Sequence, residues 1–380
     1  MTYLDNAATS LPKAPGTAAA MAWYTDALGV NIARGVYAPA NEASARILGI
    51  RENLSALFGF KGPVSHVVFT PGATFGLNTI LRGYLRPGDH VLVGSLEHNA
   101  VMRPLTELSE TGVSFTRIPA DREGITDADS IPALLRPNTR LVLVGHASNV
   151  TGTLFPLEKT AAICREYGLP LAVDAAQTAG HFPIDFFALG LAALCVPGHK
   201  GLLGPQGIGA LLLSRDFTRG LRPIVTGGTG SASDREQQPD YMPDRFESGT
   251  LNLPGIFGLG AALDYVLKTG VDTFRQREIA LTARLLDGLS GLPLRIPGPQ
   301  DPSRRVGVVS IDFTGRDNAL MADRLEREFG ILTRVGLHCA PNAHRVIGTF
   351  PQGTVRLSLG HQTTEQDIDL AIEAIRAILN

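Results

Sequence analysis

Short apolar runs alternate with segments of helical periodicity along the chain from about residue 64 onward. The runs are rich in β-branched residues and cover residues 66–69, 90–94, 114–118, 141–145 and 171–174. Between them, apolar positions recur at helical spacing over 74–85, 100–111 and 157–167. This alternation predicts βαβ units that form a mostly parallel sheet with helices on both faces.

The rest of the chain has a different pattern. Residues 8–60 are predicted to be mainly helical, with 43–58 as the clearest amphipathic segment. Residues 226–244 are rich in Gly, Ser, Asp, Gln and Pro and are predicted to form a long exposed loop. The remaining pattern predicts a smaller α+β unit, with helices at 255–268, 271–289, 317–329 and 365–379 and strands at 306–313, 331–335 and 354–359. We therefore expect an α/β protein of two domains, with a long helix bridging them near 255–290.

Composition and charge narrow the class of protein. The 380 residues carry a formal net charge of −2, with 18% charged and 44% hydrophobic residues. This balance provides no basic surface for nucleic acid or an anionic membrane, and no apolar run approaches the roughly 20 residues that span a bilayer. The first ten residues do not resemble a signal peptide, and three scattered cysteines do not suggest disulfides or a metal site. We expect a cytoplasmic protein without nucleic-acid, membrane or metal binding.

Polar residues follow most of the predicted strands. Ligands bind beyond the carboxyl ends of the strands in open α/β sheets, so these residues form the candidate site. The small-residue turn 70–74 leads into a helix, whose free N–H groups suit a phosphate. The later strands are followed by Glu97-His98-Asn99, His146-Ala147-Ser148-Asn149, Asp174-Ala175-Ala176-Gln177 and Gly198-His199-Lys200-Gly201.

A carboxylate, an amide, two imidazoles, a lysine and a phosphate cradle together describe a pocket for pyridoxal 5'-phosphate (PLP). The lysine would form a Schiff base with the cofactor, a buried carboxylate would keep the pyridine nitrogen protonated, and an imidazole would stack on the ring. The chain has five lysines, and Lys200 is the one in a Gly-rich turn after a strand. A dinucleotide site is disfavoured because no G-x-G-x-x-G follows the first strand. Each of these residues alone could be an ordinary polar residue at a strand end.

Eight short segments are spread along the whole chain, and the order in which they occur is informative. They are Tyr3-Leu4-Asp5-Asn6-Ala7-Ala8, Gly72-Ala73-Thr74, Glu97-His98-Asn99-Ala100, Ser148-Asn149-Val150-Thr151-Gly152, Val173-Asp174-Ala175-Ala176-Gln177, Gly198-His199-Lys200, Phe246-Glu247-Ser248-Gly249-Thr250 and Arg334-Val335-Gly336-Leu337-His338-Cys339. In this order they resemble the fold-type I PLP enzymes of aminotransferase class V, and specifically the cysteine desulfurase and selenocysteine lyase family. The resemblance implies an N-terminal arm (1–14) associated with the small domain, a large PLP-binding domain (15–255) with a mostly parallel mixed sheet between helices, and a small α+β domain (256–380).

The resemblance also implies roles around the cofactor ring. Lys200 would carry the Schiff base and later move the substrate's Cα proton. Asp174 would pair with the pyridinium nitrogen, and Gln177 would hydrogen-bond the phenolic oxygen. His98 would stack on the ring and handle protons.

Two further groups of residues follow from the same resemblance. The phosphate would be held by Gly72, Ala73, Thr74 and His199, with Thr250 reaching in from the second subunit of a homodimer with shared sites. The substrate carboxylate would be bound by Asn149, which also contacts the cofactor, and by Arg356 and Arg34.

Cys339 decides which reaction the resemblance implies. Cys164 and Cys195 lie in a predicted helix and an apolar run, as small core hydrophobes do. Cys339 follows a histidine and lies near arginines on a loop, where positive neighbours favour the thiolate. The implied reaction converts L-cysteine to L-alanine, with sulfur transferred to Cys339 as a persulfide and then to an acceptor thiol. The short loop resembles the branch that uses a dedicated acceptor protein.

Some features depart from the family pattern and leave alternatives open. Pro197 stands where many members have a hydroxyl residue, so one phosphate donor is lost. Residues 341–345 and the loop 226–244 also differ from the best-known members. The alternatives are a selenocysteine lyase acting on L-selenocysteine, another class V reaction such as aminotransfer or β-elimination, and a non-catalytic partner protein.

Overall fold

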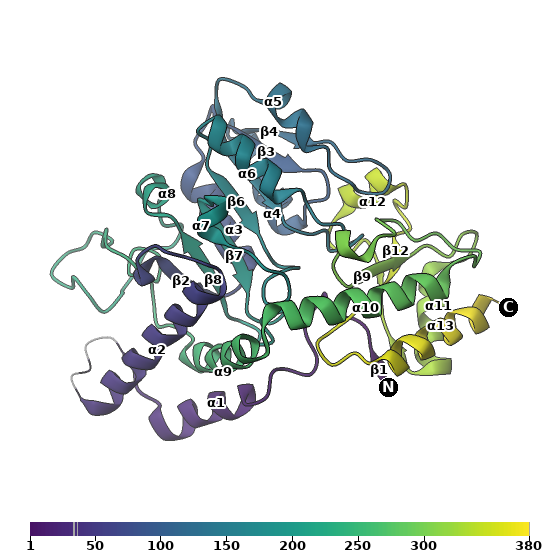
Figure 1. Ribbon diagram of the computed structural model, residues 1–380. Coiled ribbons are helices and arrows are strands. Elements are labelled where there is room, and N and C mark those ends of the chain that lie inside the picture. Colours follow the sequence, from purple (N-terminus) through teal and green to yellow (C-terminus); the bar gives the residue numbers. More distant parts are fainter. Residues whose placement is uncertain (33–34, 36, 380) are drawn as a thin grey trace.

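A seven-stranded sheet forms the centre of the molecule (Figure 1). The computed structural model describes residues 1–32, 35 and 37–379. The strand order is β2–β8–β7–β6–β5–β3–β4. The strands are β2 (Val67–Thr70), β3 (His90–Gly94), β4 (Ser114–Ile118), β5 (Thr139–Gly145), β6 (Leu171–Asp174), β7 (Ala193–Pro197) and β8 (Gly209–Leu213). All neighbours pair in parallel except β8, which runs antiparallel to β7 and β2. The prediction of a mostly parallel mixed sheet is confirmed.

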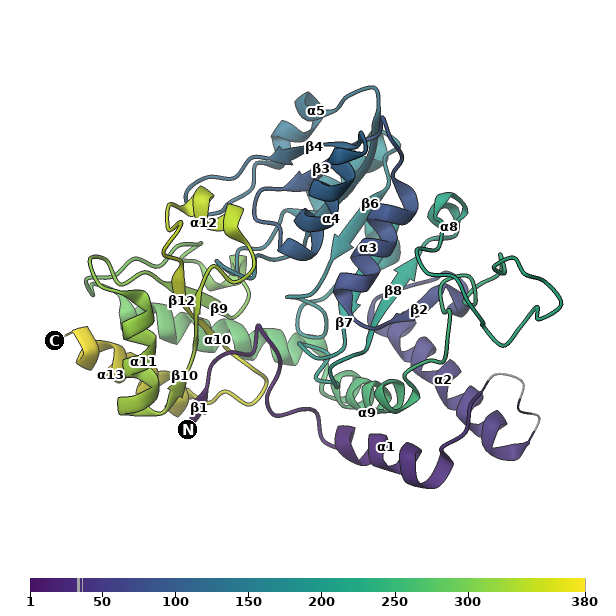
Figure 2. The same ribbon diagram turned by 180° about the vertical axis from the view of Figure 1, so that it is seen from behind.

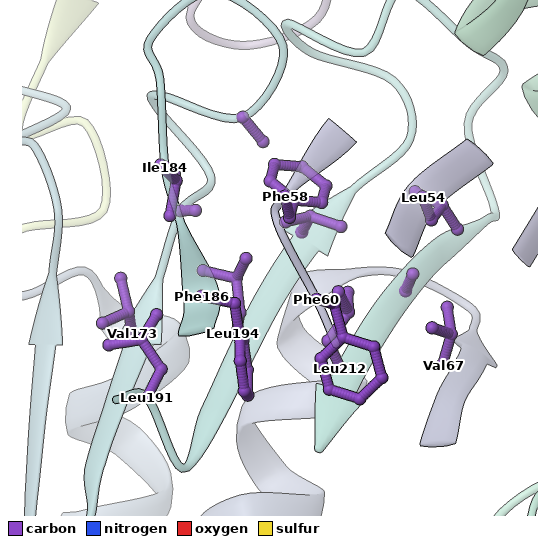
Figure 3. Packing of buried hydrophobic residues seen from close by; sticks show 14 of the residues in the cluster. Leu54, Phe58, Phe60, Val67, Val173, Ile184, Phe186, Leu191, Leu194 and Leu212 are labelled. Carbon is purple, nitrogen blue, oxygen red and sulfur yellow. The ribbon is translucent and has the colours of Figure 1, made fainter. Parts of the chain in front are cut away.

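Both faces of this sheet are buried because its strands are apolar on both sides. In β5, Val142 and Val144 point into one hydrophobic cluster and Leu141 and Leu143 into the other. The first face is covered by α2 (Ala38–Leu57), α6 (Leu157–Glu166), α7 (Phe186–Leu189) and α9 (Leu253–Thr269). Figure 3 shows part of this packing around Phe58, Leu194 and Leu212. The second face is covered by α3 (Ala73–Tyr84), α4 (Asn99–Glu110) and α8 (Arg215–Gly220).

A second, smaller unit lies at the C-terminal end of the chain. Its antiparallel sheet has the order β11–β12–β9, formed by β9 (Val308–Ile311), β11 (Arg334–Gly336) and β12 (Thr354–Ser358). Its helices are α10 (Val271–Leu289), α11 (Asn318–Phe329), α12 (Pro341–Ile347) and α13 (Glu365–Leu379). The long helix α10 runs between this unit and the central sheet (Figure 1). The domain boundary between 255 and 256 stays a prediction. It falls inside α9, which packs against α2 and α1 (Thr17–Trp23).

The N-terminal residues connect the two units. Strand β1 (Thr2–Tyr3) pairs in parallel with β10 (Ile331–Leu332), and Asp5 forms an isolated bridge with Ser358 at the end of β12. Further on, the Ser10 N–H donates to the carbonyl of His199, 2.9 Å away. The arm therefore passes from the smaller unit to the turn that carries Lys200. Short helical turns complete the fold: Tyr24–Leu28, Val64–His66, Ala128–Ser130, α5 (Ile131–Leu134) and Pro302–Arg304.

Three segments test the sequence pattern outside the sheet. Residues 221–252, all of them described, contain no helix or strand, and Figures 1 and 2 show the segment after α8 projecting from the body. The expected single strand at 331–335 is wrong, because residues 331–332 pair with β1 whereas 334–336 pair with β12. Helix in 8–60 is confined to 17–28 and 38–57 among the described residues. None of the described helices is both long and apolar enough to cross a membrane.

Candidate active site

A cavity of about 900 Å³ opens at the carboxyl ends of the central strands. Parallel strands end at the same edge of a sheet, so the turns that follow them meet there. The cavity is lined by most of the predicted site residues: Gly72, Ala73, Thr74, His98, Asn149, Asp174, Gln177, His199, Lys200, Cys339 and Arg356. Residues 334–339 and 356 come from the smaller unit, so the cavity lies between the two parts of the chain.

Lys200 lies on the turn that follows β7 and projects from the wall of the cavity. Burial lowers the pKa of its ammonium to about 8, although the nearby Asp174 carboxylate acts in the opposite direction. Among the described residues, no side chain forms a hydrogen bond or salt bridge with Nζ. Near neutral pH a much larger fraction of this amine is therefore neutral than of an ordinary lysine, and that fraction is available to react.

Asp174 is the last residue of β6 and is buried at the floor of the cavity. Its Oδ1 accepts a hydrogen bond from the Ala176 N–H at 2.9 Å. Burial raises the pKa of the carboxyl group, while this hydrogen bond and Lys200 oppose the shift. The carboxyl group therefore favours a cationic partner in the cavity. Gln177 lies beside it and donates from Nε2 to the carbonyl of Ala7 at 3.2 Å.

His98 caps the N-terminus of α4. Its Nδ1 accepts a hydrogen bond from the Ala100 N–H at 3.0 Å, so in the neutral ring the proton is on Nε2. Burial lowers the pKa of the imidazole to about 4, and Lys200 and nearby arginines act in the same direction. His98 is therefore a neutral ring with a fixed tautomer that lines the cavity.

The start of α3 forms another wall. Gly72 precedes the helix without a side-chain cap, so the N–H groups of Ala73, Thr74 and Phe75 have no acceptor among the described residues. A Cβ atom at Gly72 would meet no atom within 4 Å, which shows that the space in front of the turn is open. Three free N–H groups at the positive end of a 12-residue helix suit an anion. Pro197 lines this cavity as well and offers no donor there.

His199 ties the cavity to the N-terminal arm. Its Nδ1 lies 3.1 Å from the Thr9 hydroxyl, and its carbonyl accepts from Lys13 Nζ at 3.0 Å. Burial lowers the pKa of His199 to about 4, with Lys200 and Lys13 contributing. The ring is therefore neutral in the folded protein.

Arg356 in β12 and Asn149 after β5 are buried together on the side of the smaller unit. One Nη group of Arg356 donates to the Asn149 carbonyl at 3.0 Å, and the other contacts Asp5 Oδ1 at 2.7 Å. Asn149 in turn donates from Nδ2 to the carbonyl of His338 at 2.6 Å. The guanidinium, the amide and the turn before Cys339 thus form one connected unit.

Cys339 is the exposed thiol of the three cysteines and lines the cavity. Its φ is 58° and that of His338 is 47°, a left-handed conformation that costs about 1 kcal/mol at each non-glycine residue. The turn is held by the Asn149 bond and by the Asn99 N–H, which donates to the Cys339 carbonyl at 2.7 Å. The thiol is therefore presented by a rigid turn rather than by a free loop.

The other two cysteines are buried in the core of the large unit. Burial raises the pKa of Cys164 to about 12 and that of Cys195 well above its ordinary value. Both thiols are therefore protonated and covered, as the sequence predicted for core residues.

Thr250 and Arg34 are the remaining predicted site residues. Thr250 is exposed and does not line the cavity, and Arg34 lies outside the described residues. Three lining or adjacent residues had no role assigned from the sequence: Asp5, Glu97 and Arg334. Glu97 is buried, and its Oε1 accepts from the N–H groups of Gly94 (3.2 Å) and Gly145 (2.9 Å), which joins the ends of β3 and β5. The sequence signal that could have identified Glu97 is its position directly before His98.

The family of this chain follows from comparison with known proteins. Residues 2–370 match the family model for class V aminotransferases. The chain therefore belongs to the aminotransferase class V family, whose enzymes are PLP-dependent.

Within that family, proteins similar to this chain include several cysteine desulfurases. A probable cysteine desulfurase of Methanothermobacter thermautotrophicus is 32% identical, over 99% of this chain and 94% of its own length. The cysteine desulfurase CsdA of Escherichia coli K12 is 31% identical, over 98% and 92%. The apo structure of a cysteine desulfurase from Thermococcus onnurineus NA1 has a TM-score of 0.92 and 29% identity, covering 100% of this chain and 94% of that one. The crystal structure of E. coli CsdA in an S-sulfonic acid form has a TM-score of 0.88 and 30% identity, covering 99% and 94%.

Proposed function

We propose that this protein is a PLP-dependent cysteine desulfurase that converts L-cysteine to L-alanine and receives the sulfur on Cys339. The observation that carries this proposal is the cavity itself. It brings a lysine with a lowered pKa, a buried arginine and an exposed thiol into one space. An aminotransferase needs the first two groups, whereas a sulfur transfer also needs the third.

The residues present fit PLP. The free N–H groups at the start of α3 suit its phosphate, Asp174 suits a protonated ring nitrogen, and Gln177 and His98 flank the space between them. His199 lies at the phosphate end. When bound, the cofactor withdraws electrons from the substrate's Cα and so weakens the bonds next to it. The burial of Asp174 supports this role, because a buried carboxylate prefers a cationic partner.

Lys200 is the group that attaches the cofactor and moves a proton at the substrate's Cα. Its lowered pKa supports both roles, since each needs a neutral amine. Neutral His98 holds its proton on Nε2, facing away from the α4 N-terminus that fixes Nδ1. The substrate's carboxylate is assigned to Arg356 and Asn149, whose rigid planar groups orient it.

Cys339 completes the reaction by attacking the Sγ atom of L-cysteine. A Cys339 Sγ–S bond forms, the substrate's Cβ–S bond breaks, and the bonding pair stays on Cβ, which is then protonated to give L-alanine. The sum is one thiol and one cysteine converted to one persulfide and one alanine, with no external oxidant. The persulfide sulfur then passes to an acceptor thiol. Exposure of Cys339 supports transfer to a separate acceptor protein.

A homodimer with shared sites is part of the same proposal. Thr250 is exposed on the segment before α9, and this exposure supports a contact with a second subunit. Glu247, three residues earlier, is buried and anchors this segment to the sheet. The cytoplasmic location stays a prediction of the sequence, as do the domain limits and the expected absence of nucleic-acid, membrane and metal binding.

The test is product analysis with L-cysteine and a thiol reductant. We expect alanine and sulfide in equal amounts from the intact protein, little of either from Cys339→Ala, and unchanged products from Cys164→Ala, a buried cysteine in α6. Equal activity in Cys339→Ala, or pyruvate as product, would indicate elimination or transfer chemistry instead. A much higher rate with L-selenocysteine would indicate a selenocysteine lyase. A coloured protein that turns over neither substrate would contradict the proposal.

A further inference from the structure

The guanidinium of Arg356 is already occupied by a carboxylate of the protein itself. Asp5 Oδ1 contacts one Nη group at 2.7 Å, and the Asn149 carbonyl accepts from the other at 3.0 Å. The Nε–H is buried and has no partner among the described residues. Only 3% of the Arg356 side chain is exposed, against 20% for Asp5. A substrate carboxylate therefore cannot reach the guanidinium in this arrangement unless Asp5 moves.

The backbone around Asp5 is held by hydrogen bonds on both sides, and the contact of Asp5 with Arg356 is a further tether of this arm. On one side, the Leu4 N–H donates to the Leu332 carbonyl at 2.9 Å. On the other, the Ala7 N–H donates to the Ser358 hydroxyl at 2.9 Å. Asp5 itself bridges Ser358. The arm thus places the Asp5 carboxylate on Arg356, and release of that contact would loosen the arm around residues 5–7.

A second arginine lies next to Arg356 on the neighbouring strand. Arg334 in β11 is directly opposite Arg356 in the register of the antiparallel pair, at a Cα separation that is typically about 4.5–5.5 Å. Side chains of such cross-strand partners lie on the same face of the sheet, and like charges placed there repel. Arg334 is exposed and lines the same cavity, and its guanidinium forms no hydrogen bond or salt bridge with any described residue.

We propose that Asp5 is a resident carboxylate that occupies the substrate-carboxylate position on Arg356 and moves to Arg334 when an amino acid binds. The proposal rests on the proposed function, in which Arg356 binds the substrate's carboxylate. Asp5 offers one oxygen to Arg356, whereas a substrate carboxylate offers two and can also satisfy the free Nε–H. The exchange never leaves the buried guanidinium without a counter-charge, and it transfers Asp5 to the arginine that lacks one.

Two effects follow from this competition. The site discriminates against amines without a carboxylate, because only a carboxylate can replace Asp5. The occupied state also raises the apparent KM, since each binding event must displace an ion pair. Removing the charge in Asp5→Asn should lower the KM for L-cysteine about tenfold and leave kcat within roughly a factor of two. The reason is that Asp5 no longer competes with the substrate's carboxylate for Arg356.

The experiment uses the PLP-loaded protein, Asp5→Asn and the control Thr2→Val. Thr2 anchors the same arm through a 2.9 Å hydrogen bond to Asp367 but does not contact Arg356. The measurements are kcat and KM for L-cysteine, the dissociation constant of L-alanine, and hydrogen exchange of the peptide covering residues 2–9. We expect tighter L-alanine binding and lower KM in Asp5→Asn, but not in Thr2→Val. L-alanine should accelerate exchange at residues 5–7 in the intact protein and leave it unchanged in Asp5→Asn.

The outcomes separate this proposal from the proposed function. If L-cysteine is turned over but Asp5→Asn has an unchanged or higher KM, or L-alanine leaves the exchange of the arm unaffected, Asp5 is an orienting group and the exchange proposal is overturned alone. If L-cysteine is not turned over, the desulfurase assignment fails, and L-alanine binding and arm exchange still decide the movement of Asp5. Failure of L-alanine to bind at all would overturn the exchange proposal too.

Discussion

A buried ion pair holds the segment that carries Thr250, and its removal should destabilise the protein strongly. Glu247 accepts from the two Nη groups of Arg51 at 2.8 and 2.7 Å and from the Phe69 N–H at 2.7 Å. The side chains are only 7% (Arg51) and 5% (Glu247) exposed. The pair therefore joins α2, the edge strand β2 and the segment before α9. Glu247→Ala would leave the Arg51 charge buried and unpaired.

The magnitude follows from the burial. Leaving one partner of a buried pair uncompensated costs about 3–5 kcal/mol. An unfolding entropy of about 2.1 cal/mol/K per residue gives roughly 0.8 kcal/mol/K for a chain of this length. Glu247→Ala should therefore lower Tm by roughly 4–6 °C, measured by calorimetry or thermal shift of the loaded protein. In Arg51→Met/Glu247→Leu, which replaces both charges with apolar groups, much of the loss should be recovered.

The same helix offers a matched control. Arg46 and Glu42 form a 2.9 Å pair whose side chains are 52% and 48% exposed. Glu42→Ala should cost about 0.5 kcal/mol or less, because exposed pairs contribute little. If Glu247→Ala lowers Tm no more than Glu42→Ala does, or if the double variant is less stable than Glu247→Ala, the reasoning from burial is refuted.

Three further predictions concern the buried carboxyl group of Glu97, the packing of α3 and the turn before Cys339. Burial raises the pKa of the Glu97 carboxyl group from 4.5 to about 8, so between these pH values the folded state keeps a proton that the unfolded state releases. The contribution of this proton to the free energy of unfolding is complete below pH 4.5 and is lost as pH rises toward 8. In thermal scans, the stability of Glu97→Gln relative to the intact protein should therefore increase as pH rises from 5 to 8, by at most about 1.4 kcal/mol per pH unit. A stability difference that does not depend on pH would contradict this prediction. In α3, a Cβ at Gly76 would lie 2.5 Å from Cys195 Sγ. Gly76→Ala should lower the free energy of unfolding by denaturant by about 1–3 kcal/mol, and Gly76→Ala/Cys195→Ala should recover part of this loss. If the double variant recovers nothing, the loss does not come from the contact with Cys195. Asn149→Ala removes the bond to the carbonyl of His338 and should lower sulfide production about tenfold, since an unpaired buried carbonyl costs about 1–3 kcal/mol. Asn342→Ala, which loses a 2.7 Å bond to the Ser95 carbonyl, is the control, and equal rates in the two variants would contradict a role for the His338 turn.

The central sheet and the strand-end residues could be predicted because both depend on local patterns. Continuous apolar runs indicated strands covered on both faces, and parallel strands bring Asp174, His98 and Asn149 to one edge regardless of the details of packing. The strand expected at 331–335 could not be resolved from its sequence, because two different partners, β1 and β12, divide it. Pairing across the chain has no local signature.

Residues that depend on distant contacts were the ones that sequence analysis left without a role. Asp5 and Arg356 are separated by 351 positions, and their contact arises from the path of the N-terminal arm. Glu97 was visible in its motif, but its bonds to Gly94 and Gly145 depend on the adjacency of β3 and β5. The role of Thr250 in a second subunit stays a prediction, because a single chain does not contain the partner's cavity.

The pairing of β1 with β10 has a consequence for synthesis on the ribosome. Thr2 is made 329 residues before its partner Ile331. The seven strands of the large sheet are all complete by residue 213, so this sheet can form while the N-terminal arm is still unpaired. Asp5 and Ala7 gain their contacts with Ser358 only afterwards. The pocket is therefore complete only after residues 334–356 have emerged, and a nascent chain that stops before residue 331 would hold a folded sheet but an open site.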